Sequence, residues 1–312
     1  MTLAVVAALA MTTVAFFVDM PAALTENAGI CLPSPDAWGL PRVAAWIANT
    51  ALIFACGGLI SWVNKEFRLT ATSDPVWQGM FLVAATSNVW LSGMFSASAL
   101  LALVNIACLM VLFGCYKQRN ATRELFVIGT ILAIGSMFEY AFLFMTPVFI
   151  IGAIMLKCFS FKALVAFIMG LAAPYWVGIG FGIIDPVSLE WPIFRHPFEG
   201  YASHTDLLVG LLNVGITVIG ALLLSLSNAV RLYAGNSRRR IFNMTLNLLG
   251  AVACICMVFD FQNLTVYLAT IYLVAALQMA NMMEFSNPRR PGWWLLSIGM
   301  VYAGAFVLMI TL

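Results

Sequence analysis

Long apolar runs separated by short polar stretches occupy most of the chain. A helix needs about 20 apolar residues, at about 1.5 Å per residue, to cross the hydrocarbon core of a bilayer. The sequence therefore predicts eleven membrane segments and an all-α, polytopic helix bundle that forms a single domain, 1–312. The segments cover approximately 2–18, 43–63, 77–92, 96–116, 124–138, 140–157, 162–184, 206–230, 241–259, 263–283 and 293–312.

Two pairs of these segments follow one another almost without a loop. The first pair meets near Gly93, and the second meets at Glu139 and Tyr140. The first member of each pair is also short for a full span. Two interpretations stay open: all four segments cross the membrane, or each pair is a re-entrant hairpin. With either interpretation, the later segments cross the membrane in the same directions.

The composition supports a membrane location. Hydrophobic residues make up 63% of the chain and charged residues only 9%, whereas soluble domains carry about 25% charged residues. The 15 Lys and Arg and 13 Asp and Glu residues are too few to cover a soluble surface of this size. This excludes a soluble globular enzyme, a disordered chain, a coiled coil and a nucleic-acid-binding protein.

The charges of the loops predict the orientation, because Lys and Arg concentrate in cytoplasmic loops. With the N-terminus in the cytoplasm, 13 of the 15 basic residues fall inside, and only Arg42 and Arg195 fall outside. Nine of the 13 acidic residues fall outside. Residues 1–18 could instead form a signal peptide, but no Lys or Arg precedes their apolar run. The remaining orientation is the same in either case.

The outer loop at about 185–205 contains Arg195 and both histidines of the chain, His196 and His204. One interpretation is a solvated loop along the membrane interface. A second is a site in which Arg195, His196 and the other outer cation, Arg42, bind a lipid phosphate. A third is a metal site formed by the histidines with Glu199 and Asp206, although this spacing matches no established signature.

Carboxylates near the outer ends of the segments are the other candidates for chemistry. In the loop at about 19–42, Asp19 is a candidate general base and Asp36 a candidate metal ligand alongside His204. Glu139 and Asp260 lie in tight turns beside the hydrocarbon, where ionisation is costly, and Glu139 is a candidate catalytic residue. The plain alternative is that outer loops tolerate acids freely and that these residues mark the water boundary.

Polar residues inside the segments predict contacts between helices. We expect the amides of these segments to form interhelical hydrogen bonds. They are Asn49, Asn88, Asn105, Asn213, Asn247 and Gln278. Gly170 and Gly178 predict close helix packing, with a bend at Pro174 that lines a cavity as the alternative. The run Arg238–Arg240 predicts a topology anchor that meets anionic lipid.

Short motifs within about 40–185 resemble an uncharacterised family of polytopic inner-membrane proteins of Bacteroidota. The motifs are Asn64-Lys65, then Phe126, Gly129, Gly135, Ser136 and Phe138, then the stretch from Leu156 to Lys162, and last Gly170-x-x-x-Pro174-Tyr175. The family has Arg and Pro where Lys157 and Cys158 stand here. The resemblance implies a bacterial inner membrane and the same topology, and it leaves the function open.

The arrangement of segments is also similar to the membrane domains of lipid-linked, GT-C type glycosyltransferases. The similarity lies in an acid in the first outer loop, Asp19, and in the two short hairpin pairs. The Asp-Glu or Glu-x-Asp pattern of such enzymes and a soluble outer domain are missing. The resemblance implies a polyprenyl-phosphate-linked substrate at the outer face, with its phosphate held by Arg195 and His196.

Three functions therefore stay open. The leading hypothesis is a membrane partner or cell-envelope assembly component. The alternatives are a glycosyltransferase-like enzyme and a transporter of lipids or small molecules, so whether the chain is an enzyme is undecided. The expected partners are membrane lipids, a polyprenyl-phosphate carrier and another protein, and the sequence points to no particular cofactor.

Overall fold

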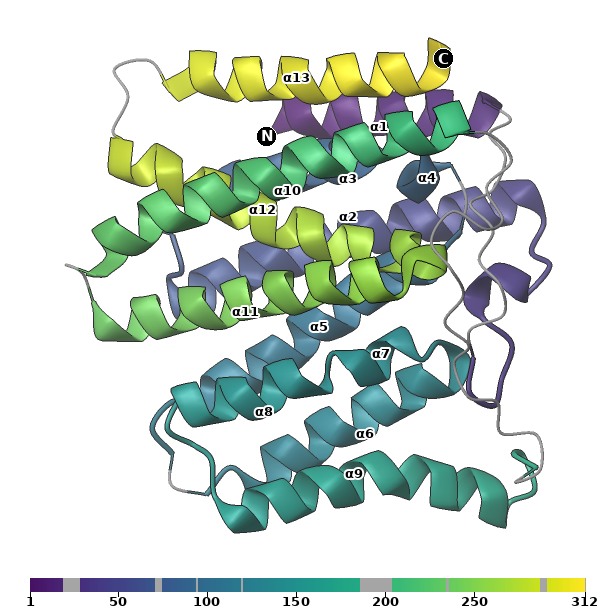
Figure 1. Ribbon diagram of the computed structural model, residues 1–312, viewed down its shortest axis with the longest axis vertical. Helices are drawn as coiled ribbons and strands as arrows, with labels where there is room; N and C mark the ends of the chain where they lie inside the picture. The colour runs from purple at the N-terminus through teal and green to yellow at the C-terminus, as the bar shows by residue number, and fades with distance from the viewer. Residues whose placement is uncertain are drawn as a thin grey trace.

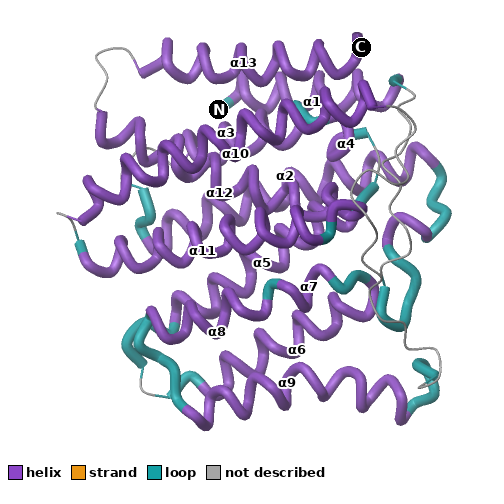
Figure 2. Tube along the Cα trace, in the orientation of Figure 1, coloured by secondary structure: helices purple, strands orange, loops and turns teal. Residues whose placement is uncertain are grey.

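The computed structural model describes residues 1–18, 29–70, 75–93, 95–118, 120–185, 204–233, 236–286 and 291–311. Every regular element among these residues is a helix (Figure 2). The prediction of an all-helical chain is confirmed for this part of the molecule. The elements are α1 (Thr2–Phe17), η1 (Pro35–Ala37), α2 (Arg42–Phe67), α3 (Pro75–Thr86), α4 (Val89–Ser92), α5 (Ala97–Gly114), α6 (Thr122–Phe138), α7 (Ala141–Phe144), α8 (Thr146–Met155), α9 (Phe161–Gly180), α10 (His204–Tyr233), α11 (Ser237–Phe259), η3 (Phe261–Asn263), α12 (Leu264–Ser286) and α13 (Pro291–Thr311).

Six helices in the described ranges are long and apolar enough to cross a membrane. They are Arg42–Phe67, Ala97–Gly114, Phe161–Gly180, Gly210–Arg231, Ser237–Phe259 and Leu264–Glu284. Shorter apolar helices occupy Thr2–Phe17, Val76–Thr86, Ala141–Met155 and Leu295–Thr311. The chain is thus a helical protein with several helices that are long and apolar enough to span a membrane, and the figure of eleven stays a prediction.

In each of the two pairs of closely connected segments, one segment consists of two short helices instead of one continuous helix. Residues at each interruption explain why the helix ends there. Between α3 and α4 the side chain of Asn88 accepts a hydrogen bond from the main-chain N–H of Trp90, which caps the second, short helix. Between α7 and α8 the chain turns at Met145, and Pro147 sits in the first turn of α8, where its missing N–H costs no helical hydrogen bond. The predicted turn after α6 is present at Glu139, whose backbone is extended.

Helix α12 lies at the centre of the molecule, between α3, α5, α10 and α11 (Figure 1). Of its most apolar stretch, 94% is buried within the bundle, compared with 22% for α9 and for α10. In Figure 1 α13 lies along one edge of the bundle and α9 along the opposite edge. The bundle is therefore built around one nearly enclosed helix, and peripheral helices leave most of their apolar surface exposed.

Helices α6 and α9 approach closely at two glycines. A Cβ at Gly170 would overlap the carbonyl oxygen of Phe126, and a Cβ at Gly129 would overlap that of Phe167. Further along the two helices, toward their C-terminal ends, the hydroxyls of Ser136 and Tyr175 lie 2.7 Å apart, within hydrogen-bonding distance. Small residues allow helix backbones to meet in this way. The prediction that Gly170 serves close packing is confirmed.

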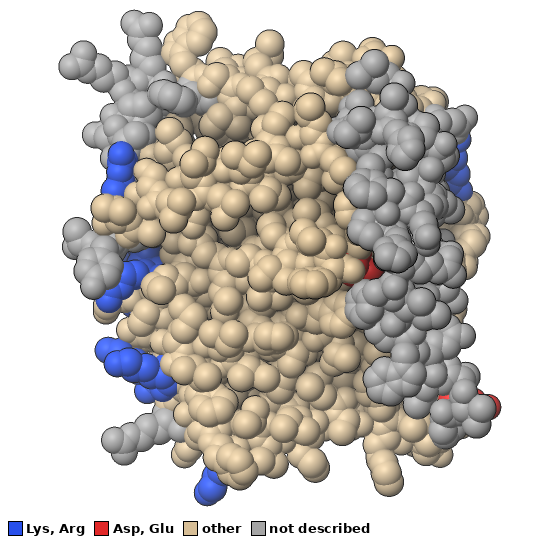
Figure 3. Space-filling view, viewed as in Figure 1, with Lys and Arg blue, Asp and Glu red and all other residues tan. Residues whose placement is uncertain are grey.

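Basic side chains gather at one end of the helices among the residues described (Figure 3). Helices α2, α5, α8 and α10 end at this end, and α6, α9 and α11 begin there. Its basic residues are Lys65, Arg68, Lys117, Arg123, Lys157, Lys162, Arg231, Arg238, Arg239 and Arg240. Arg42 begins α2 at the opposite end, where Glu139 and Asp260 follow α6 and α11. We call the two ends the basic end and the acidic end.

Candidate functional site

Two buried carboxylates mark the acidic end of the bundle. Glu139 directly follows α6 and Asp260 directly follows α11, at the turns that the sequence predicted. Their relative exposures are only 1% and 4%. Solvated acids at a water boundary are not buried in this way. The hydrogen-bond partners of the two carboxyl groups therefore determine which chemistry they can support.

Asp260 is held by three hydrogen-bond donors from its own chain. The hydroxyl of Tyr140 donates to Oδ1 over 2.8 Å, and the hydroxyl of Tyr267 donates to Oδ2 over 2.9 Å. The side-chain amide of Asn263 donates to Oδ1 over 3.1 Å and also to the hydroxyl of Tyr140. This group, which we call the Asp260 cluster, joins the α6–α7 turn to the α11–α12 turn.

Burial controls the electrostatics of the Asp260 cluster. Burial raises the pKa of the Asp260 carboxyl above its ordinary value, and the hydrogen bonds from Tyr140, Tyr267 and Asn263 oppose this rise without cancelling it. Burial and the nearby Asp260 carboxyl also raise the pKa of Tyr140. Tyr140 therefore stays protonated and can donate, while Asp260 retains a proton at higher pH than a solvated aspartate.

Glu139 contacts the first outer loop. The hydroxyl of Ser34 donates to Oε2 of Glu139 over 3.2 Å. The main-chain N–H groups of Cys31 and Leu32 donate to the carbonyl of Met137, over 3.2 and 2.9 Å. The loop that precedes η1 is thereby attached to the last turn of α6. These contacts satisfy carbonyl groups that a helix C-terminus otherwise leaves without partners.

The other predicted site residues are only partly covered by the structure. Arg42 donates to the carbonyl oxygen of Phe16 over 2.6 Å, and its guanidinium lies 5.1 Å from the centre of that ring. It therefore contacts the C-terminal turn of α1, where helix carbonyls favour a cation. For Asp36 in η1 and His204 at the start of α10 only the backbone is described, and Asp19, Arg195, His196 and Glu199 lie outside the described residues.

The proposed metal site is not assembled within the part of the chain that the structure describes. Asp206 lies in α10, with no description of its side chain. Among the described residues, no group of three or more His, Cys, Asp and Glu side chains could hold a metal ion. The predicted ligands Asp36 and His204 are not described as side chains, so the metal hypothesis stays a prediction.

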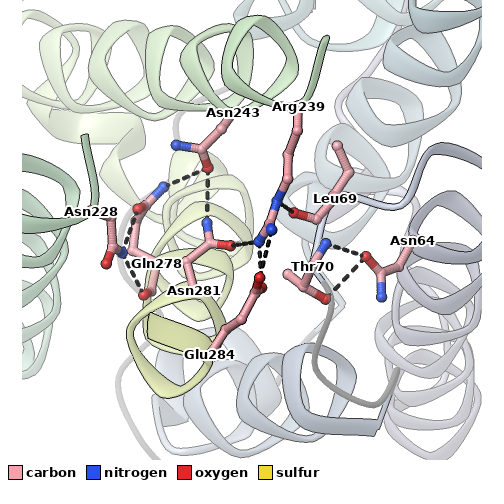
Figure 4. Close-up of polar contacts among 9 residues, drawn as sticks. All are labelled: Asn64, Leu69, Thr70, Asn228, Arg239, Asn243, Gln278, Asn281 and Glu284. Atoms are coloured by element: carbon pink, nitrogen blue, oxygen red, sulfur yellow. Dashed lines mark hydrogen bonds and ion pairs between the residues drawn. The ribbon is translucent and has the colours of Figure 1, made fainter. Parts of the chain in front are cut away.

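A second polar centre lies at the basic end and was not predicted. The guanidinium of Arg239 forms an ion pair with Glu284 at the end of α12, with Nη1 2.5 Å from Oε1 (Figure 4). Its Nε donates to the carbonyl of Leu69 over 2.6 Å, and Nη2 donates to Asn281 over 3.1 Å. Arg239 therefore turns into the bundle rather than toward lipid headgroups. The signal in the sequence is Glu284, an acid at the inner end of an apolar segment.

Amide side chains continue this centre toward the middle of the bundle (Figure 4). Asn281 donates to Oδ1 of Asn243 over 3.0 Å, and Gln278 donates to the same oxygen over 3.3 Å. Gln278 also donates to Asn247 over 2.6 Å and accepts from Asn228 over 3.0 Å. We call these residues, with Arg239 and Glu284, the inner amide network. It connects α10, α11 and α12.

Hydrogen bonds at Tyr272 lie between the two centres. Asn88 donates to its hydroxyl over 3.0 Å, and that hydroxyl donates to Asn213 over 3.0 Å. The remaining predicted amides also bond between helices: Asn49 donates to the carbonyl of Leu91, and Asn105 donates to Thr270. The prediction that these amides bind helices together is confirmed, and most of the bonds involve α12.

Comparisons with models of protein families and with curated proteins find no match for this sequence. The resemblances inferred from short motifs therefore stay predictions.

Proposed function

We propose that the chain crosses a bacterial inner membrane eleven times, with its N-terminus and the basic end in the cytoplasm. The direction of successive helices supports this proposal, because each connection between helices returns the chain across the bundle (Figure 1). The grouping of Lys and Arg at one end supports it as well. On this proposal the broken helices α3–α4 and α7–α8 each make one passage.

Thiol labelling tests the topology. In a background whose seven cysteines are replaced, Lys65→Cys and Asp185→Cys place one exposed thiol at each end of the bundle. A membrane-impermeant maleimide added to intact cells is expected to label Asp185→Cys, and to label Lys65→Cys only after the membrane is permeabilised. Labelling of both positions from the same side would contradict the proposed topology.

We further propose that the bundle acts as a membrane partner, an assembly component of the cell envelope. The observation that carries this proposal is that α12 is hydrogen-bonded on several sides, by Asp260 at one end and by the inner amide network at the other. Hydrogen bonds between membrane helices hold them in one arrangement. A rigid bundle with large apolar outer faces suits a subunit that positions other membrane proteins.

Cross-linking in living cells followed by purification tests the partner role. We expect a defined protein to be recovered at a constant ratio to the chain, and to be missing when an unrelated polytopic protein of similar abundance is the bait. Replacement of Glu139 by Gln is expected to leave this recovery unchanged, because a partner role requires no catalytic carboxylate. A bundle recovered alone under all cross-linking conditions would argue against the role.

A second candidate function is an enzyme that acts on a lipid-linked substrate at the acidic end. It is favoured by the position of Tyr140 between the two buried carboxyls, in hydrogen-bond contact with Asp260 and next to Glu139 in the chain. Asp260 retains its proton to a higher pH than a solvated aspartate and is suited to general acid catalysis, and Glu139 is the catalytic candidate that the sequence predicted. Transfer from a polyprenyl-phosphate sugar in nanodiscs should then fall about 100-fold or more in Glu139→Gln. Glu66→Gln, at an exposed position of the basic end, should remain active.

A further inference from the structure

The structure separates the members of the basic run Arg238–Arg240. Arg239 turns into the bundle, whereas Arg238 is exposed in the first turn of α11. The guanidinium carbon of Arg238 lies 5.2 Å from the ring centre of Phe242 and 5.8 Å from that of Tyr116. The sequence predicted that the whole run meets anionic lipid, and Arg238 is exposed in a position to do so.

A second cation lies at the same tyrosine ring. The ammonium nitrogen of Lys117 is 5.4 Å from the ring centre of Tyr116, and the lysine is exposed. The main-chain N–H of Lys117 donates over 3.0 Å to the carbonyl of Leu156, which precedes Lys157 in the chain. The ends of α5 and α8 and the start of α11 thus bring three basic residues to one side of the bundle (Figure 1). We call Lys117, Lys157, Arg238 and Tyr116 the Tyr116 cluster.

The three cations of the Tyr116 cluster lack a counter-charge in the part of the chain that the structure describes. None of them forms an ion pair with a described acid. Glu284 pairs with Arg239 instead, and Glu124, in the first turn of α6, also makes no ion pair with the cluster. Like charges gathered around one ring repel one another, so a bound anion would stabilise this arrangement.

The helix ends explain the charge of the two lysines but not that of the arginine. Lys117 and Lys157 follow the ends of α5 and α8, where helix carbonyls favour a cation. Their φ angles are 61° and 59°, a left-handed conformation that glycine adopts at lower cost. Arg238 instead lies at the N-terminal end of α11, where the helix dipole disfavours a cation. Its position at the ring therefore calls for negative charge from another source.

We propose that the Tyr116 cluster binds the phosphate of an anionic phospholipid headgroup. The cluster lies where three helices begin or end, the level at which hydrocarbon gives way to headgroups. A phosphate diester supplies a negative charge and acceptor oxygens for guanidinium and ammonium groups.

The aromatic base of the cluster favours such binding. The ring of Tyr116 packs edge-on against Phe242, and Phe242 stacks on Phe113 with ring centres 4.3 Å apart. The cation–π contacts hold Lys117 and Arg238 over these packed rings. Less side-chain freedom is then lost when a headgroup binds.

The headgroup site rests on the proposed topology only because that topology places the basic end in a headgroup layer. Binding of lipid to the purified chain does not depend on which compartment this end faces. Thiol labelling in cells can therefore fail while lipid binding is found, and the reverse, so the failure of one proposal is distinguishable from the failure of the other.

Native mass spectrometry of the detergent-solubilised chain tests the site. Phosphatidylglycerol is titrated into the protein, with zwitterionic phosphatidylcholine of the same acyl chains as the comparison. We expect the wild type to bind phosphatidylglycerol more tightly. Lys117→Gln combined with Arg238→Gln should weaken this binding about 30-fold, because each basic residue near a headgroup contributes about fivefold. The matched control, Lys65→Gln with Arg231→Gln, removes the same charge from exposed positions of the basic end and should bind as the wild type does.

Equal melting temperatures of the two double variants without added lipid show that both are folded. If the cluster variant is unstable, Lys157→Gln alone should weaken phosphatidylglycerol binding about fivefold. Equal binding of the two lipids by the wild type would overturn the proposal. An equal loss in the control variant would also overturn it, because the charge of the whole end would then be responsible. Displacement of phosphatidylglycerol by millimolar inorganic phosphate would assign the cluster to a soluble anion instead.

Discussion

The hydroxyl of Tyr140 donates a hydrogen bond to Oδ1 of Asp260 over 2.8 Å, although 120 residues separate the two in the chain. This bond ties the turn after α6 to the turn after α11. Because Tyr267 and Asn263 bond to the same carboxyl, one buried acid fixes the position of α12 at the acidic end.

Replacing Tyr140 by Phe should destabilise the protein by about 1–3 kcal/mol, because it removes one donor from a buried carboxyl and one acceptor from Asn263. Thermal unfolding in detergent measures the change. Tyr116→Phe is the matched control, since the Tyr116 hydroxyl makes no hydrogen bond within the described residues and its ring contacts are retained. Equal melting temperatures for the two variants would contradict the role assigned to Tyr140.

Asp260 should make stability depend on pH. Burial raises its pKa in the folded state, so the folded chain binds this proton more tightly than the unfolded chain. The resulting stabilisation is complete below the ordinary carboxyl pKa of about 3.9 and is lost as pH rises through the raised pKa. Lowering the pH from about 7 toward about 4 should therefore stabilise the wild type relative to Asp260→Asn.

The measurement for Asp260 is a series of melting curves for both proteins across this pH range. Glu66→Gln, at an exposed position in the last turn of α2, is the control and should follow the wild type. If the difference between wild type and Asp260→Asn is constant with pH, the carboxyl does not bind its proton more tightly in the folded state.

The Arg239–Glu284 pair should depend on the geometry of the guanidinium and not on charge alone. Arg239→Lys keeps the positive charge but loses the fork that contacts Glu284, Asn281 and the Leu69 carbonyl. We expect a loss of about 1.5–3 kcal/mol by chemical denaturation in detergent. Arg238→Lys, whose parent side chain stacks on Tyr116 and Phe242, should change stability by less than about 0.5 kcal/mol.

A double-mutant cycle separates the ion pair from the other contacts of Arg239. Glu284→Gln combined with Arg239→Lys should show a coupling energy of about 0.5–3 kcal/mol. Additive effects of the two substitutions would mean that the pair contributes nothing beyond its individual hydrogen bonds.

The α6–α9 contact should be intolerant of a single methyl group. Gly170→Ala places a Cβ against the carbonyl oxygen of Phe126, where main-chain atoms cannot move aside. Overpacking of this kind costs about 1–3 kcal/mol. Gly180→Ala adds the same methyl group at the end of α9, where no atom lies within 4 Å. Proteolysis rates in detergent should rise for Gly170→Ala alone, and a wild-type rate would show that the helices can separate at little cost.

The positions of the helices and the membrane nature of the chain could be read from the sequence. Helix formation and membrane burial depend on local composition, since an apolar run of sufficient length satisfies its own backbone hydrogen bonds in lipid. The turns near Gly93 and Glu139 were likewise predicted, because turns depend on residues close in the chain. The sorting of Lys and Arg followed from the same segments.

Only the tertiary structure decided which helix is central and which polar groups meet. Helix α12 is the most buried of the six long helices, yet its most apolar stretch has the lowest mean hydropathy among them, 1.5. In a bilayer both lipid-facing and buried positions are apolar, so no amphipathic pattern marks the inner face of a helix. Tyr140 is far from Asp260 in the chain, and Glu284 and Asn281 are far from Arg239. These pairings depend on how the helices pack, which no local pattern encodes.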